Sequence, residues 1–287
     1  MHSWLKNEYN VLDRLYRTGM VPHGRPRPLR APFHFYTFYT LDSFHNPTTF
    51  QQFSHLVAAE STRRGGVSSA PFSSLNLGIN TNDDSKNVLE NRRIFFEKLG
   101  ISEAQFASSY QVHGDKVQVV TEAGRTEGYD ALITNQPNVF VGVTVADCTP
   151  ILIYDARNQA VGAVHAGWRG TVAEIVLKTL QTMQQSYGTQ PTDCYAYVGT
   201  CIDECSFEVG EEVAEQFSDE FKRFDAILGK YLIDLKRANA AQLAAFGIPD
   251  SQIEISPFST ITHNEDYFSY RLEKGQTGRM LAVIGVR

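Results

Sequence analysis

The chain of 287 residues has an ordinary globular composition, with 42% hydrophobic residues, 20% charged residues and a net charge of −6. A general nucleic-acid-binding protein usually carries a basic surplus, so we expect no nucleic-acid partner, although a small anionic ligand remains compatible with this balance. No stretch approaches the ~20 consecutive apolar residues of a membrane span, and the N-terminus lacks the apolar core of a signal peptide. We therefore expect a cytoplasmic protein with no membrane partner.

The start of the chain differs in composition from the rest. The stretch at 23–32 is basic and rich in proline, which predicts an extended segment with little regular structure. We predict an N-terminal extension over residues 1–45 and a main domain over residues 46–287. A basic docking tail is the alternative for the extension.

From residue 53 onward, strand patterns and helix patterns are mixed without strict alternation. Apolar and β-branched runs predict strands over 55–62, 105–114, 116–120, 130–134, 138–156, 159–170, 194–200, 252–256 and 279–286. Amphipathic spacing predicts helices over 85–100, 171–188, 210–224 and 232–247. We expect Ser85 to cap the first helix and Gly100 to end it, and Thr171 and Glu174 to form a capping box on the second. This order favours an α+β or mixed-sheet α/β domain over a doubly wound one.

Three reactive side chains stand at predicted strand ends beside glycines or turns. They are His113 in QVHG, Cys148 in VADCTP and His165 in VHAGWRG. A thiolate and two imidazoles suit zinc or copper, and three protein ligands leave one position open, as in catalytic zinc sites. A metal-free Cys148 nucleophile activated by His165 is the competing hypothesis, and spacing alone does not separate the two. Taken singly, each residue has an ordinary structural interpretation as well.

An anion site is the second element that the sequence suggests. The turn Gly167–Gly170 leads directly into a predicted helix, whose free N–H groups and Arg169 would favour a phosphate. Arg63, beside a glycine pair, offers a similar cation. An ordinary strand–helix turn and a solvated arginine are the alternatives. Asp147, adjacent to Cys148, is a candidate proton shuttle.

Many motifs of the chain occur in the order of a known family. They are RRGGVSSAPFSSLNLG, VLENRR, QVHG, DALIT, VADCTPILIYD, GAVHAGWRGT, FEVGEEV and FSYR…TGR. Over about residues 53–287 the chain resembles the multicopper polyphenol oxidoreductase (laccase-domain) family, also described as purine nucleoside phosphorylases and including the peptidoglycan editing factor. The chain departs from the family pattern in GTCIDEC at 199–205 and at Ser259, where a cysteine is usual.

The resemblance implies an α+β fold in which mixed β-sheets are layered with helices in a single domain. It also implies a zinc or copper ion on His113, Cys148 and His165. Arg63 and Asn76 match an arginine and an asparagine of the family, and with Arg169 we take them as candidate substrate- or phosphate-binding residues.

The implied activity is phosphorolysis of adenosine, inosine and S-methyl-5′-thioadenosine, with adenosine deamination as a side activity and a nucleoside and phosphate as partners. A copper-dependent laccase-type polyphenol oxidase is the alternative. The chain has eight histidines and no His-x-His pair, whereas a laccase copper cluster draws on many histidine pairs, so zinc is the preferred metal. A peptidoglycan-precursor editing or binding factor with a structural metal ranks last, because structural zinc sites usually have four protein ligands. The sequence does not fix the oligomeric state.

Overall fold

The structure, a computed structural model, describes residues 43–287. Predictions for residues 1–42, which make up most of the expected extension, lie outside the described residues. Residues 44 and 45, also placed in the extension, form β1 (Phe44–His45), which pairs antiparallel with β2 (Leu56–Ser61).

The described chain forms two six-stranded sheets and one three-stranded sheet. The first sheet has the order β1, β2, β15 (Met280–Val286), β7 (Phe140–Val145), β3 (Phe106–Tyr110), β5 (Gly124–Glu127). The second has the order β14 (Ile253–Ile255), β10 (Cys194–Val198), β8 (Thr149–Asp155), β9 (Ala160–Ala166), β6 (Ala131–Thr134), β4 (Val117–Val119). Both contain parallel and antiparallel pairs, which confirms the predicted mixed-sheet α+β class.

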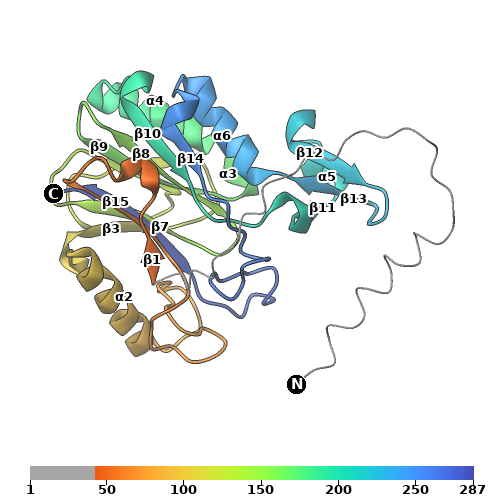
Figure 1. Ribbon diagram of the computed structural model, residues 1–287, viewed down its shortest axis with the longest axis horizontal. Helices are drawn as coiled ribbons and strands as arrows, with labels where there is room; N and C mark the ends of the chain where they lie inside the picture. The colour runs from red at the N-terminus through yellow and green to blue at the C-terminus, as the bar shows by residue number, and fades with distance from the viewer. Residues whose placement is uncertain (1–42) are drawn as a thin grey trace, which may run out of the picture. The chain divides into compact units, whose positions relative to one another are not determined.

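The two large sheets pack face to face, and helices cover their outer faces (Figure 1). The sequence of strand β15 is apolar throughout because both faces of the strand are buried. Ala282 and Ile284 join the core between the sheets, whereas Leu281 and Val283 pack towards α2 (Ser85–Leu99). Because successive residues of a strand point to opposite faces, a strand buried on both sides is a continuous apolar run. Helices α4 (Ile175–Tyr187) and α6 (Leu235–Phe246) cover the second sheet.

Helix ends agree with the predictions in part. Gly100 ends α2 in the left-handed conformation as expected, but Asp84 rather than Ser85 is the N-cap and accepts from the backbone of Lys86. The predicted helix 171–188 is two helices, α3 (Trp168–Val172) and α4, separated at Glu174, which has a φ of 59°. The expected capping box is therefore wrong.

The predicted helix over 210–224 is also wrong beyond its first turn. The range holds the short α5 (Glu211–Ala214) and one 3-10 turn at Asp219–Phe221, and the chain continues into the hairpin β12 (Lys222–Asp225) and β13 (Lys230–Ile233). The carboxylate of Asp225 accepts from the N–H groups of Ile227 and Leu228, and Gly229 adopts a φ of 60°, so local turn chemistry outweighs the helical spacing. With β11 (Glu208–Val209) the hairpin makes the three-stranded sheet.

Candidate metal centre

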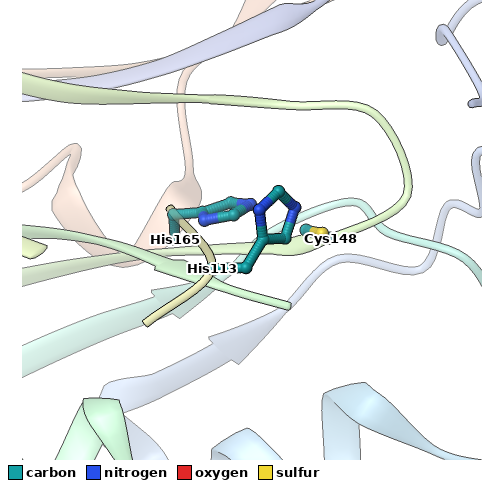
Figure 2. Close-up of side chains that lie close together, drawn as sticks. All are labelled: His113, Cys148 and His165. Carbon is teal, nitrogen blue, oxygen red and sulfur yellow. The ribbon is translucent and has the colours of Figure 1, made fainter. Parts of the chain in front are cut away.

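The three predicted ligand residues converge from three segments of the chain. His113 lies between β3 of the first sheet and β4 of the second, and Cys148 lies between β7 of the first and β8 of the second. His165 lies in β9 opposite Pro150 of β8, so the residue just before β8 lies beside the end of β9. Potential ligand atoms of the three side chains all lie within 4.8 Å of one another. Figure 2 shows the two imidazole rings and the thiol gathered at one place.

Unusual backbone holds the two connections that carry His113 and Cys148. His113 has a φ of 59° and Asp147, which precedes Cys148, has a φ of 86°. Non-glycine residues rarely adopt such values, and where they do the surrounding structure must hold them in place. The side chain of Gln111 ties the His113 connection to the first sheet, with hydrogen bonds of 2.9 Å to the N–H and C=O groups of Thr144.

Asp130 supports two of the three ligands with one buried carboxylate. It accepts from the backbone N–H groups of His113 at 3.0 Å and Gly114 at 2.8 Å, and so holds the turn around His113. Its Oδ1 also lies 2.8 Å from Nδ1 of His165. Hydrogen bonds and the charge of His165 outweigh burial and lower the pKa of Asp130, so the carboxylate is ionised and Nδ1 carries the proton. Nε2 is then the atom of His165 that can bind a metal once it has lost its own proton.

The charges of Cys148 and His165 stabilise one another. Burial by itself would raise the pKa of the Cys148 thiol, but the charge on His165 and hydrogen bonds from both imidazoles lower it to about 6. Burial likewise disfavours a charged His165, yet Cys148 and Asp130 raise its pKa to about 9. A thiolate is the form of cysteine that binds metals, so Cys148 is already in that form near neutral pH, whereas a bound metal ion would have to displace a proton from His165.

The donor set and the space around it fit a single zinc or copper ion. A thiolate and two imidazoles are ligands that both metals accept. Gly167 leaves the space free, because a Cβ there would lie 3.1 Å from Sγ of Cys148 and 3.2 Å from Cδ2 of His113. The two imidazoles beside one thiol favour a metal site over a Cys–His nucleophile, which needs only one.

The cluster lies in the wall of a cavity of about 520 Å³. Besides the three ligands, the wall includes Tyr110 and Tyr270, whose side chains are half exposed. Pockets of this size hold small molecules, and aromatic faces beside polar groups suit a flat heterocycle.

The structure does not bring the predicted anion-binding residues to this cavity. Arg63 forms an ion pair of 3.0 Å with Glu273, donates to two backbone carbonyls, and lies over the ring of Phe268. Arg169 is exposed on α3 and stacks on Trp168 with 4.4 Å between the guanidinium carbon and the ring centroid. Neither lines the cavity.

Asn76 and Asp147 also have partners that the sequence did not suggest. Asn76 is fully buried, and its Oδ1 accepts from the backbone N–H groups of Gly78 and Arg279. Asp147 does line the cavity, but its carboxylate accepts three hydrogen bonds from the C-terminal segment, from Thr260, Ser269 and Arg271. These bonds hold the C-terminal segment against the Cys148 turn, and the role of Asp147 as a proton shuttle stays a prediction.

Two residues of the site were missed in the sequence. Asp130 is the first residue of the predicted strand 130–134, and Arg279 belongs to the TGR motif. The only available signal was their position in matched motifs, because neither stands in a pattern with its own chemical meaning.

Comparisons with known proteins agree with this architecture. Residues 57–287 match the family described as multi-copper polyphenol oxidoreductase laccase. Over 253 residues the chain is 36% identical to a purine nucleoside phosphorylase of Bacteroides thetaiotaomicron, covering 83% of this chain and 93% of that protein. A purine nucleoside phosphorylase of Deinococcus radiodurans is 39% identical over 236 residues, covering 79% of this chain and 88% of that protein. The crystal structure of YlmD from Geobacillus stearothermophilus superposes with a TM-score of 0.80 at 34% identity, covering 86% of this chain and 97% of that one.

One negative finding concerns membranes. Within residues 43–287, the structure has no helix with the length and apolar character needed to cross a bilayer.

Proposed function

Because the chain belongs to the multi-copper polyphenol oxidoreductase laccase family, we propose that it is a metal-dependent purine nucleoside phosphorylase. Its proposed substrates are inorganic phosphate and adenosine, inosine or S-methyl-5′-thioadenosine, with adenosine deamination as a side activity. Relatives named purine nucleoside phosphorylase support this activity. The observation that carries the proposal is the His113–Cys148–His165 cluster in the wall of a cavity of about 520 Å³.

The reaction needs a binding site for the base, a binding site for phosphate, and groups that stabilise the charge that moves to the leaving base. An oxygen of hydrogenphosphate bonds to the anomeric carbon while the bond from that carbon to the purine nitrogen breaks. The bonding electrons leave with the base, which takes up the proton that hydrogenphosphate gives up. A zinc ion held by His113, Cys148 and His165 would supply a Lewis acid at this wall of the cavity. Tyr110 and Tyr270 offer ring faces against which a purine can stack.

The deciding experiment is a nucleoside assay on zinc-loaded protein. We expect inosine to give hypoxanthine only when phosphate is present, and the His113→Ala variant to lose most of this activity. Elemental analysis of the purified protein, in parallel, should give about one metal ion per chain, the number that one three-ligand cluster implies. Metal-loaded protein that releases no hypoxanthine with or without phosphate would contradict the proposal.

Copper-dependent oxidation of phenols is the second candidate, because the family description and the sulfur–nitrogen donor set both suit copper. The part of the chain that the structure describes contains one such cluster, so this activity would depend on a single copper ion. Oxygen uptake with a phenol and added copper tests it. Uptake that persists in Cys148→Ala would show that this site is not responsible.

A further inference from the structure

One arginine of the cavity has donor groups that no acceptor within residues 43–287 uses. Arg279 lines the cavity together with His113 and Cys148. Its Nη1 donates to the carbonyls of Thr277 at 3.0 Å and Gly278 at 2.8 Å. Its Nε and Nη2 have no hydrogen-bond partner within residues 43–287, and no described carboxylate lies within ion-pair distance. A largely buried guanidinium with free donors is costly unless a ligand satisfies them.

The protein fixes this arginine from both sides. The buried Asn76 accepts from the backbone N–H of Arg279 at 2.9 Å, and the carbonyl of Arg279 accepts from Leu77 at 3.0 Å. Gly78 leaves room for the side chain, because a Cβ there would lie 2.6 Å from Cγ of Arg279. The ring of Tyr270 lies 5.4 Å from the guanidinium carbon. The side chain is thus held in place before any ligand arrives, which lowers the entropy that binding costs.

The other arginines of the cavity wall are engaged differently. Arg92 is paired with Glu103 and Arg271 with Glu208, both at 2.7 Å. Arg125 is exposed, and its one side-chain hydrogen bond in the described part of the chain is to the amide oxygen of Asn80, at 3.0 Å. Arg125 and Arg279 therefore both contact the short loop 78–81, and no carboxylate among the described residues neutralises either of them.

We propose that Arg279, with Arg125 as a second cation at the 78–81 loop, forms the binding site of an oxyanion, called here the seat. We propose further that this anion is the inorganic phosphate consumed in phosphorolysis. The assignment rests on the proposed function for the identity of the anion. A guanidinium presents two parallel N–H groups that match two phosphate oxygens. The seat belongs to the same cavity wall as the metal ligands, so phosphate and a nucleoside would share one chamber.

Phosphate titration of the zinc-loaded protein tests the seat without depending on turnover. Binding of inorganic phosphate is measured by calorimetry, and its KM is measured separately from the KM of inosine. In Arg279→Gln we expect the phosphate constants to weaken by about tenfold or more, which is the loss of one charge-assisted contact, with a smaller change in the KM of inosine. Arg279→Lys should retain part of the affinity, because it keeps the charge but not the paired donors.

Two further variants complete the design. Arg157→Gln is the matched control, since that side chain is 73% exposed and lies outside the cavity wall. Arg169→Gln tests the competing site at the start of α3. Phosphate binding that is unchanged in Arg279→Gln, lost in Arg169→Gln, or absent from the wild-type protein would overturn the seat. If wild type binds phosphate through Arg279 but cleaves no nucleoside, the seat stands and the proposed phosphorolysis fails.

Discussion

Asp130 is the residue on which the geometry of the centre most depends, because it contacts both the His113 turn and the His165 ring. In Asp130→Asn the side chain loses its charge and one acceptor atom, while its volume is kept. We expect zinc affinity to fall roughly 10- to 100-fold, as for other supporting carboxylates of metal-bound histidines. Competition with a chelator of known affinity measures the change.

Asp155 provides the matched control for that substitution. It is equally buried, and its carboxylate accepts from the backbone of Arg157 and Asn158 at the far end of β8. Asp155→Asn should lower the free energy of unfolding yet leave zinc affinity unchanged. Equal zinc affinity in both variants would show that Asp130 has only a structural role.

The thiols of the chain should differ sharply in reactivity when no metal is bound. The pKa of Cys148 is lowered to about 6, so its reactive thiolate forms as the pH rises through 6. Burial raises the pKa of Cys194 and Cys201 to about 12, and a hydrogen bond to Asp203 raises that of Cys205, although Cys205 is exposed.

We therefore expect iodoacetamide at pH 7 to label Cys148 before Cys205 in metal-free protein, with a labelling rate whose midpoint lies near pH 6 and which levels off above it. Peptide mass spectrometry identifies the site, and added zinc should protect it. Labelling of Cys205 first, or a midpoint near 9, would refute the assigned charge state.

The individual site residues show what the sequence could and could not reveal. His113, Cys148 and His165 were candidates because they stand at predicted strand ends beside glycines or turns, and the family resemblance is what favoured a shared metal ion over a metal-free nucleophile. Arg63 and Arg169 looked equally suitable for an anion, but a sequence does not show whether Glu273 or Trp168 will occupy the guanidinium. Partners of long charged side chains depend on tertiary contacts, and so they could not be predicted.

At the scale of elements, the turn between β9 and α3 allows the metal ligands to approach one another. Gly167 has a φ of −72°, which any residue can adopt, so an alanine there would act only through its Cβ, close to Cys148 and His113. We expect Gly167→Ala to weaken zinc binding by about tenfold, with little change in the free energy of unfolding. Equilibrium zinc titration and denaturant unfolding separate the two effects.

Gly114→Ala is a suitable control because it changes a neighbouring turn of the same centre. A Cβ at Gly114 would meet Asp130 and Val112 at 3.5 and 3.6 Å, which are ordinary contact distances. Its zinc affinity should stay near that of the wild type. Similar losses in both variants would mean that the site tolerates no side chain in either turn, and that the specific crowding at Gly167 is not the cause.

Element type was predictable where burial and spacing agree. The strands β7, β8, β9 and β15 are buried on both faces and were recognised as apolar runs, and the buried strands expected within residues 138–156 are two strands in different sheets. The break at Ala146–Cys148 carries the metal ligand, so the functional residue lies where the regular pattern stops. The hairpin at 222–233 was missed because the predicted helices 210–224 and 232–247 covered its two ends, whereas the Asp225 turn joins two strands there.

At the scale of the whole molecule, the α+β class was predictable but the stacking of two sheets was not, since strand order depends on contacts far apart in the chain. That stacking places the centre on two connections that pass between the sheets. The core between them is built from aliphatic residues such as Val141 and Val161, and does not depend on the metal. We therefore expect metal-free protein to stay folded, as is typical of a catalytic metal site, whereas a protein that depends on a structural metal would unfold.

Metal binding should nevertheless raise the melting temperature by mass action. With free zinc at about 100 times its dissociation constant, the native state gains about 2.7 kcal/mol, or roughly 5–10 °C for a domain of this size. Calorimetry with and without a chelator measures the shift, and far-ultraviolet circular dichroism reports whether the metal-free protein is folded. The His113→Ala variant should lose most of the zinc-dependent shift while melting close to metal-free wild type, since His113 is exposed. A metal-free wild type that is unfolded at 25 °C would instead favour a structural role for the metal ion, and with it a binding function over catalysis.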